Sequence, residues 1–209
     1  MSPSTLRILI VGVGGQGVLS AARHIGQAAL DHGLEARIGQ IHGLSQRGGS
    51  VESTVVLGPG STGFVSMGQA DVLLALEPLE ALRALARVHG ETLALVNRAT
   101  VIPFSQTLAG ASYPSVDGLL GGLAGVAGRV YGLDATALAS ETGSPRSLNA
   151  AMLGTLCGLD CLPLAAAALR QSLAGAGRPA FRPMNLAAFD AGLATADQLE
   201  PTAPPTRQA

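Results

Sequence analysis

A glycine-rich turn directly after an apolar segment constrains this chain more than any other feature. Residues 6–11 are Leu-Arg-Ile-Leu-Ile-Val, and residues 12–17 are Gly-Val-Gly-Gly-Gln-Gly, followed by a helical pattern. The pattern G-x-G-x-x-G is informative when it follows a strand and opens a helix, as it is expected to do here. Gly12 permits the tight turn, Gly14 allows close approach of a ligand or a backbone, and Gly17 lets the helix pack near the strand. The N-terminus of that helix favours an anion at the turn.

Apolar segments of strand character alternate with helical patterns along the rest of the chain. Residues 71–76 form a continuous apolar run typical of a buried parallel strand, and residues 92–97 repeat this pattern. The alternation predicts an α/β fold, Rossmann-like and doubly wound, with a mainly parallel sheet and helices on both faces. The 209 residues suit one domain, which we expect at 1–200, followed by a disordered tail at 201–209.

Single residues mark several expected helix ends. Gly33 is expected to end the helix after the glycine turn, and Pro78 to open the next helix. Ser115 is expected to cap a third helix, Asp134 to begin another, and Asn149 to cap the helix that follows it.

Polar or glycine-rich segments follow several predicted strands at the point where each strand ends. In a parallel sheet these ends meet at one edge, where ligands bind. We therefore expect the segments to form one site that binds a cofactor or a partner. Its candidate residues are Gly12, Gly14, Gly15, Gln16, Gly17, Ser45, Gln46, Gly48, Gly49, Glu77 and Asn97.

Residues 42–49 bring four hydrogen-bonding side chains next to two glycines. Arg47 offers a planar fork that suits a carboxylate, a phosphate or a cluster of carbonyls. His42 can titrate near neutral pH. Both are candidate catalytic residues. The alternative is structural: His42 bonds loop carbonyls, and Arg47 pairs with a carboxylate such as Glu77.

A glycine turn of this kind can hold a dinucleotide, but the second predicted strand argues against that use. A nicotinamide site usually has Asp or Glu at the end of this strand, about 20 residues past the turn, where it binds the ribose hydroxyls. Here that position is Gln40 or Ile41, and Glu35 falls at the start of the strand. We therefore expect no binding of NAD or FAD by this chain alone.

Charge and composition exclude several classes of function. The net charge is −1, and all 13 basic residues are scattered arginines. Nucleic-acid binding without sequence preference needs a basic face, so none is expected. The absence of lysine excludes a Schiff-base lysine and the lysine of a P-loop. Charged residues are only 13% of the chain, which indicates either a surface that meets another protein or a bias toward Ala and Gly codons.

The two cysteines limit the metal cofactors that this chain can bind, and the hydropathy pattern indicates whether it crosses a membrane. Cys157 and Cys161 stand four residues apart in an apolar stretch, where they form either a metal pair or, as we predict, two core thiols. They cannot supply the four thiolates of a 4Fe–4S cluster. No apolar run reaches the roughly 18 residues of a membrane span, so we expect a cytoplasmic protein without membrane contact.

The two segments at residues 12–17 and 42–49 together resemble the gamma-type domain of 2-oxoacid:ferredoxin oxidoreductases. The resemblance extends from Leu6 to about Phe189, and it is strongest to the small subunits of the indolepyruvate-oxidising members. The further segments that match in order are Gly-Gln-Ala-Asp at 68–71, Glu-Pro-Leu-Glu-Ala at 77–81, Asn97, Ile-Pro at 102–103, Tyr-Pro at 113–114 and Asn-Ala-Ala-Met-Leu-Gly at 149–154. Two departures are Gln40, where the family often has an acidic residue, and Leu-Ser at 44–45, where Met-Ala is commoner.

This resemblance implies oxidative decarboxylation of a 2-oxoacid, here an arylpyruvate, to an acyl-CoA and carbon dioxide. In the family, thiamine diphosphate carries the carbanion chemistry and iron–sulfur clusters pass electrons to ferredoxin. The sequence lacks a Gly-Asp-Gly segment with a following Asn for a Mg²⁺–diphosphate. The resemblance therefore implies that this chain binds no cofactor alone. Thiamine diphosphate, Mg²⁺ and 4Fe–4S clusters are expected on a large partner subunit, with CoA as co-substrate.

Two other hypotheses stay open at this point. The glycine turn after a strand also suits an autonomous NAD(P)- or FAD-binding oxidoreductase. The low charge and the many small residues also suit a structural adaptor subunit without a catalytic role.

Overall fold

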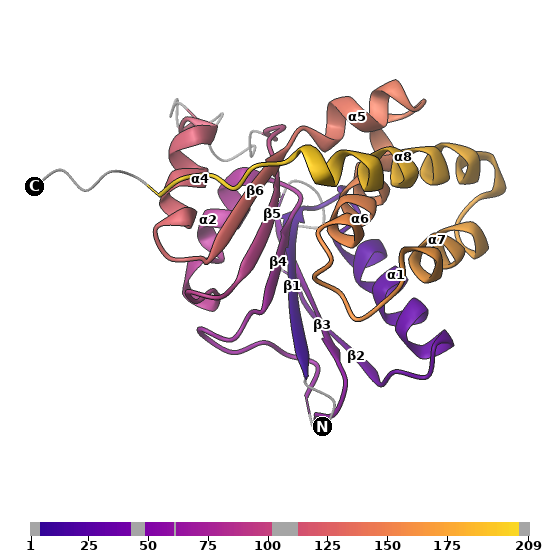
Figure 1. The fold of residues 1–209 in the computed structure, drawn as a ribbon, viewed down its shortest axis with the longest axis horizontal. Helices are drawn as coiled ribbons and strands as arrows, with labels where there is room; N and C mark the ends of the chain where they lie inside the picture. The colour runs from indigo at the N-terminus through magenta and orange to yellow at the C-terminus, as the bar shows by residue number, and fades with distance from the viewer. Residues whose placement is uncertain (1–4, 43–48, 61, 102–112, 205–209) are drawn as a thin grey trace, which may run out of the picture.

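The computed structural model describes residues 5–42, 49–60, 62–101 and 113–204. In this part of the chain six strands form one mixed sheet with helices on both faces (Figure 1). The architecture confirms the predicted α/β class. The strands are β1 (Leu6–Val13), β2 (Ala36–His42), β3 (Ser50–Leu57), β4 (Val72–Ala75), β5 (Leu93–Asn97) and β6 (Arg129–Leu133).

The strand order is β2-β3-β1-β4-β5-β6, and β3 runs antiparallel to both of its neighbours. The pairs β1–β4, β4–β5 and β5–β6 are parallel, as predicted. The prediction did not include the antiparallel β3. Its physical cause is the short connection between His42 and Ser50, which has no room for the crossover that a parallel neighbour requires. Because β2 is again parallel to β1, the ends of both strands still lie at the same edge of the sheet.

One face of the sheet carries the larger of two hydrophobic cores. Alternate residues of the strands, such as Ile8 and Ile10 of β1, are fully buried there against the helices. Helix α6 packs so closely on α8 that a Cβ at Gly154 would lie 2.0 Å from the carbonyl oxygen of Phe189. The helices of this face are α1 (Val18–Asp31), α5 (Ala135–Glu141), α6 (Leu148–Gly158), α7 (Ala166–Gly175) and α8 (Arg182–Thr195), with the 3-10 turns η2 (Pro145–Ser147), η3 (Pro179–Phe181) and η4 (Ala196–Gln198) between or after them.

The opposite face is covered by α2 (Pro78–Arg83), the 3-10 turn η1 (Leu85–Arg87) and α4 (Val116–Ala124). These elements lie over β4, β5 and β6, on the left in Figure 1. The core here includes Leu9, Leu73 and Val96.

Local sequence signals place several helix ends as predicted. Gly33 follows α1 with φ of 75°, the left-handed conformation expected after a helix C-terminus. Pro78 occupies the first turn of α2, which tolerates proline. The side chains of Ser115 and Asp134 accept hydrogen bonds from Gly118 N and Ala137 N, which caps α4 and α5.

The C-terminal segment returns to the sheet before the described part of the chain ends. Thr202 N donates a hydrogen bond to Val130 O at 2.7 Å, on the outer edge of β6. Thr202, in the predicted disordered tail, therefore contacts the domain, and residues 205–209 lie outside the described part. The domain boundary at residue 200 stays a prediction.

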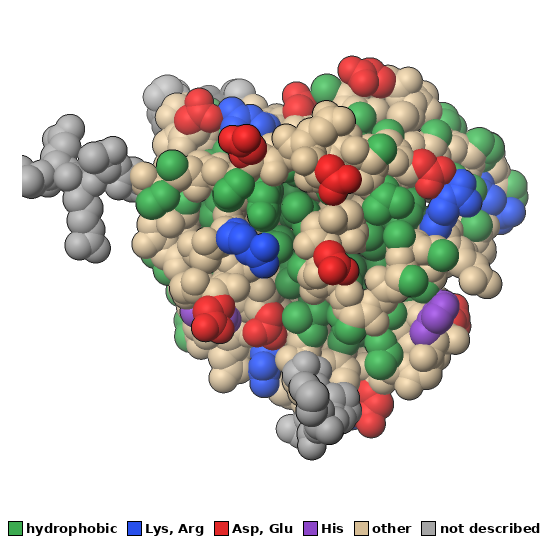
Figure 2. Space-filling model, in the orientation of Figure 1, with side chains coloured by type: hydrophobic (Ala, Val, Ile, Leu, Met, Phe, Trp, Pro, Cys, Tyr) green, Lys and Arg blue, Asp and Glu red, His purple; other side chains and the backbone are tan. Residues whose placement is uncertain are grey.

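On the face shown in Figure 2, the basic side chains are scattered among acidic and uncharged ones and form no continuous basic surface. Within residues 5–204, as far as they are described, no helix combines the length and apolar character needed to cross a membrane.

A histidine lies at the contact between α1 and α7. His24 Nδ1 is 3.1 Å from Ser172 Oγ. Burial lowers the pKa of His24 below its usual 6.5, against an opposing hydrogen bond to Ser172. The folded protein therefore disfavours the protonated ring, whereas the unfolded chain accepts the proton near pH 6.5.

We predict that this histidine makes the protein less stable as the pH falls below 6.5. Between the unfolded and folded pKa values the unfolded state binds more protons, so the free energy of unfolding rises with pH there. Urea denaturation at pH 7.5 and pH 5.5 should show a larger loss for the wild type than for His24→Gln. The matched control His32→Gln, at an exposed position just after the same helix, should keep the wild-type loss. An identical pH dependence in all three proteins would contradict the prediction.

Candidate functional site

The glycine turn joins β1 to α1 in the predicted strand–turn–helix arrangement. Gly15 and Gly17 have φ of 107° and 89°, in the left-handed region that favours glycine. Gly17 is the N-cap of α1 and provides no side-chain cap. Gly14 N donates to Gly49 O at 2.9 Å, so the turn lies beside the end of the 42–49 connection. Two candidate segments that are far apart in sequence therefore meet.

The side chain of Gln16 fills the inside of the glycine turn and bonds to the backbone at two points. Its Oε1 accepts from Val13 N at 2.7 Å, and its Nε2 donates to Leu76 O at 2.9 Å. A Cβ at Gly12 would lie only 2.9 Å from Gln16 Oε1. The space that Gly12 leaves is therefore filled by the protein's own carboxamide.

Gly17 makes room for a residue of α6. A Cβ there would lie 2.9 Å from Asn149 Nδ2, so the first turn of α6 rests on the start of α1. The expectation that Asn149 caps the helix after it is wrong, because Ser147 holds the N-cap position of α6. Ser147 Oγ instead donates to Asn185 Oδ1 at 2.7 Å, which ties α6 to α8. Asn149 is the residue that α6 adds to the site.

Glu77, two residues after the end of β4, is fully buried. Its Oε2 accepts from Glu80 N at 2.9 Å and caps α2. Its Oε1 accepts from the hydroxyl of Tyr113, which itself accepts from Leu79 N at 3.1 Å. Burial, followed by the bond to Glu77, raises the pKa of Tyr113 well above its usual value. Arg47, which the structural alternative pairs with Glu77, lies outside the described residues.

Asn97 ends β5 and is also fully buried. Its Nδ2 donates to Leu76 O at 3.1 Å and to Thr136 Oγ1 at 3.1 Å, and its Oδ1 accepts from Ala135 N at 3.1 Å. The side chain therefore holds the start of α5 against the ends of β4 and β5. Sequence position indicated that Asn97 stands at the edge but gave no sign of these partners.

Only the two ends of the 42–49 connection belong to the described part of the chain. His42 is the last residue of β2 and pairs with Val51, and Gly49 contacts the glycine turn. The candidate residues that lie outside the described part are Ser45, Gln46, Arg47 and Gly48.

The strand order of the sheet distinguishes this edge from the dinucleotide-binding site of a Rossmann fold. In the Rossmann fold the strand after the first crossover neighbours β1 and positions the acidic ribose ligand. Here β3 lies between β1 and β2, so Gln40 pairs with Ser53, and Ser53 in turn pairs with Ile10. The end of β2 is therefore one strand farther from the turn than a bound ribose requires.

The described residues contain no group of three or more His, Cys, Asp and Glu side chains arranged to hold a metal ion. Burial raises the pKa of Cys157 and of Cys161 to about 12, and Cys161 Sγ donates to Leu156 O. Burial therefore disfavours the thiolate form of both cysteines, which are partly buried and pack against the hydrophobic core.

Fold and site together define a class of protein: an α/β domain whose Rossmann-like glycine turn is filled by its own side chains. The chain belongs to the pyruvate ferredoxin/flavodoxin oxidoreductase family, whose model matches residues 7–195. It is 35% identical over 198 residues to the indolepyruvate oxidoreductase subunit IorB of Archaeoglobus fulgidus. The aligned region covers 95% of this chain and 98% of that protein.

Solved structures share the fold. The gamma subunit of a keto/oxoacid ferredoxin oxidoreductase from Geobacter sulfurreducens superposes with a TM-score of 0.67 and 23% identity, covering 92% of this chain and 99% of that one. A 2-oxoglutarate:ferredoxin oxidoreductase from Magnetococcus marinus gives a TM-score of 0.71 with 22% identity, covering all of this chain and 33% of that one. The same fold therefore occurs both as a separate chain and as part of a longer one.

Tyr113→Phe should destabilise the protein by removing the hydroxyl that links Glu77 to α2. The change leaves one oxygen of a buried carboxylate and one backbone N–H without this partner, so we expect the free energy of unfolding to fall by about 1.5–3 kcal/mol. Urea denaturation measures it. Tyr131→Phe is the control, because the Tyr131 hydroxyl has no hydrogen bond within the described residues, and it should cost less than about 0.5 kcal/mol. Equal losses in the two variants would contradict the assigned bond.

Proposed function

We propose that this chain is the small subunit of a thiamine-diphosphate-dependent indolepyruvate ferredoxin oxidoreductase. The complex converts an arylpyruvate and CoA to an acyl-CoA and carbon dioxide and passes the electrons to ferredoxin. The observation that carries the proposal is the 35% identity to a subunit of indolepyruvate oxidoreductase over nearly the whole of both chains. Membership of the pyruvate ferredoxin/flavodoxin oxidoreductase family supports the reaction class.

The proposed function requires a second, larger subunit that carries the cofactors. The sequence has only two cysteines, too few for the four thiolates of a 4Fe–4S cluster. We infer that thiamine diphosphate, Mg²⁺ and the 4Fe–4S clusters belong to a larger partner subunit, which supplies the carbanion and redox chemistry. The complex works in the cytoplasm, a reducing compartment in which free thiols such as those of Cys157 and Cys161 are stable.

The carboxyl edge of the sheet is the surface that meets this partner. Gly15 is exposed at the tip of the glycine turn, with no atom within 4 Å of a Cβ placed there. The backbone of the turn can therefore approach another chain closely. Gln16, Glu77 and Asn97 make the edge rigid through their internal bonds, while His42 and Arg47 provide the polar groups that act on the partner or on a substrate carboxylate.

The two other hypotheses are less well supported by this geometry. Autonomous binding of NAD or FAD would need the turn to be open and a ribose ligand beside it, whereas Gln16 fills the turn and β3 displaces β2. A purely structural adaptor is compatible with the fold, so it is separated from the proposed role by activity measurements.

Co-expression with the larger subunit tests the proposed function. We expect a stable complex that reduces a viologen dye with indolepyruvate and CoA, and that does so faster than with pyruvate or 2-oxoglutarate. The larger subunit alone should be inactive. Equal activity of the larger subunit without this chain would contradict the proposal, and a preference for another 2-oxoacid would correct the substrate.

Within the same complex, Arg47→Ala and His42→Ala separate a functional edge from a structural adaptor. We expect each to lower turnover about tenfold or more, equivalent to about 1.4 kcal/mol of transition-state stabilisation, without loss of assembly in gel filtration. Arg170→Ala is the control, because Arg170 pairs with Asp190 on the exposed surface of α7 and α8. Unchanged turnover in all three variants would favour the adaptor.

A further inference from the structure

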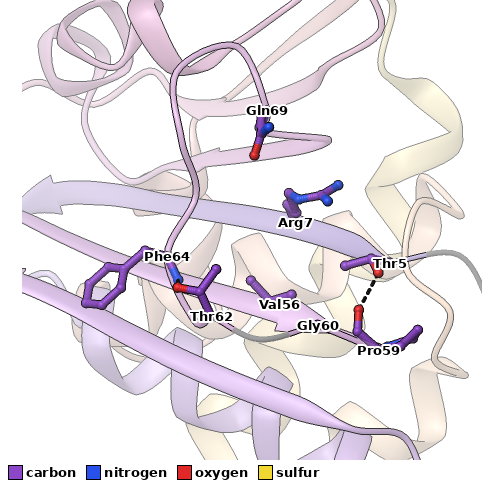
Figure 3. Close-up of a pocket in the computed structure, with 8 residues that line it drawn as sticks. All are labelled: Thr5, Arg7, Val56, Pro59, Gly60, Thr62, Phe64 and Gln69. Atoms are coloured by element: carbon purple, nitrogen blue, oxygen red, sulfur yellow. Dashed lines mark hydrogen bonds between the residues drawn. The ribbon is translucent and has the colours of Figure 1, made fainter.

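A small hollow lies at the opposite end of β1 from the glycine turn. Its volume is about 170 Å³. Arg7 and Gly12 are five residues apart along β1, which places the hollow roughly 17 Å from the turn. Figure 3 shows that Arg7 and Gln69 approach the hollow from different elements, with Val56 as its floor. The lining residues are Thr5, Arg7, Val56, Pro59, Gly60, Thr62, Phe64 and Gln69.

The N–H donors of the Arg7 guanidinium have no hydrogen-bond partner among the described residues. Its nearest carboxylate oxygen is Asp71 Oδ2, 3.8 Å from Nη1, which is beyond hydrogen-bond distance. That oxygen accepts the backbone N–H of Arg7 at 2.7 Å. Within the described residues the guanidinium therefore makes no hydrogen bond, although it is only 37% exposed.

The other polar groups of the hollow include further donors. The carboxamide of Gln69 has no hydrogen bond to another described residue, so its N–H groups can donate and its oxygen can accept. Thr62 Oγ1 accepts from Phe64 N at 3.1 Å, which leaves its own O–H to donate. Thr5 Oγ1 donates to Pro59 O at 2.5 Å. Free N–H and O–H groups next to an arginine favour a negatively charged ligand.

A second arginine on the same face shows what is special about Arg7. Val56 of β3 pairs with Arg7 on one side and with Arg37 on the other, so the three residues form one row across the sheet. Arg37 is equally exposed, at 36%, but it donates to Glu35 Oε2 at 2.8 Å and to Gly58 O at 3.2 Å. Of this pair, only Arg7 lines the hollow, and only its guanidinium makes no hydrogen bond to the described residues.

Charge and size narrow the ligand to one chemical class. Asp71 offsets part of the charge of Arg7, which favours a monoanion over a phosphate dianion. The planar fork of arginine matches a carboxylate, and Val56 and Pro59 provide apolar surface for the carbon atoms attached to it. A cavity of about 150 Å³ holds benzene, whereas cofactor pockets are usually about 300–1,000 Å³. We propose that the hollow is a binding site for a small monocarboxylate, either a free organic acid or the side chain of an acidic residue from another subunit.

Binding of 4-fluorobenzoate to the isolated full chain, followed by fluorine NMR, tests the proposal. We expect saturable binding with Kd of order 1 mM, as befits a ligand of about ten heavy atoms. Acetate should compete, and inorganic phosphate at equal ionic strength should not. Absence of saturable binding, or stronger competition by phosphate than by acetate, would overturn the proposal.

Three variants assign the binding to the hollow. Arg7→Gln should weaken it at least tenfold by removing the charge. Gly60→Leu should do the same by filling the space, since a Cβ at Gly60 meets only Val56 Cγ1, at 3.7 Å, and so enters without a clash. Arg37→Gln is the matched control and should stay within twofold of the wild type. Circular dichroism checks that each variant is folded. An equal loss in Arg37→Gln, or unchanged binding in both other variants, would also overturn the assignment.

The two sources of the carboxylate are distinguished in the complex with the larger subunit. If an acidic side chain of that subunit occupies the hollow, the complex should no longer bind 4-fluorobenzoate, and Arg7→Gln should weaken assembly. If the ligand is a free acid, the complex should bind the probe as the isolated chain does. Both results support recognition of a carboxylate by Arg7. The binding test on the isolated chain does not depend on the proposed enzymatic function.

Discussion

One backbone carbonyl, that of Leu76, holds the functional edge of this protein together. It accepts Gln16 Nε2 at 2.9 Å and Asn97 Nδ2 at 3.1 Å, while Leu76 N donates to Val11 O at 2.8 Å. The ends of β1, β4 and β5 are thereby joined at a single residue. Because buried polar groups are costly without partners, all three bonds favour one arrangement of these strand ends. Glu77 follows immediately and extends the same network to α2 through its cap.

This network changes the meaning of the glycine turn. In a dinucleotide-binding domain the glycines make space for a ligand, whereas here they make space for Gln16 and Asn149. The antiparallel β3 has a related effect, because it moves β2 away from the position where a ribose ligand would be held. The turn therefore remains as a rigid structural feature at the edge of the sheet. Such an edge is suited to support the chemistry of a partner subunit, which is the role we propose.

The sequence predicted those features of the fold that depend on nearby residues. Gly33 after α1, Pro78 at the start of α2 and the capping side chains of Ser115 and Asp134 each act within a few positions, and the structure has them as expected. The α/β class followed from apolar runs that alternate with helical patterns. The antiparallel β3 was missed because strand order was inferred from this alternation, while the short connection after His42 decides the direction of β3.

The sequence predicted the location of the candidate site better than its contacts. Gly12, Glu77 and Asn97 were expected at one edge, and the structure places them there because each ends or follows a strand whose end lies at that edge. The bond from Tyr113 to Glu77 spans 36 residues, and the contact of Gly17 with Asn149 joins two helices. No local pattern encodes such contacts, since they depend on how complete elements pack. The roles of His42 and Arg47 stay predictions.

Calorimetry on the isolated chain tests most directly whether the glycine turn is closed to nucleotides. NAD⁺, NADP⁺ and FAD are each titrated into the purified protein at ligand concentrations up to about 1 mM, a range that detects Kd values tighter than that. If Gln16 fills the turn as the bonds to Val13 and Leu76 indicate, none of the three should give saturable heat. Saturable binding of any of them with a sub-millimolar Kd would contradict a closed turn and make this chain a nucleotide-binding protein in its own right.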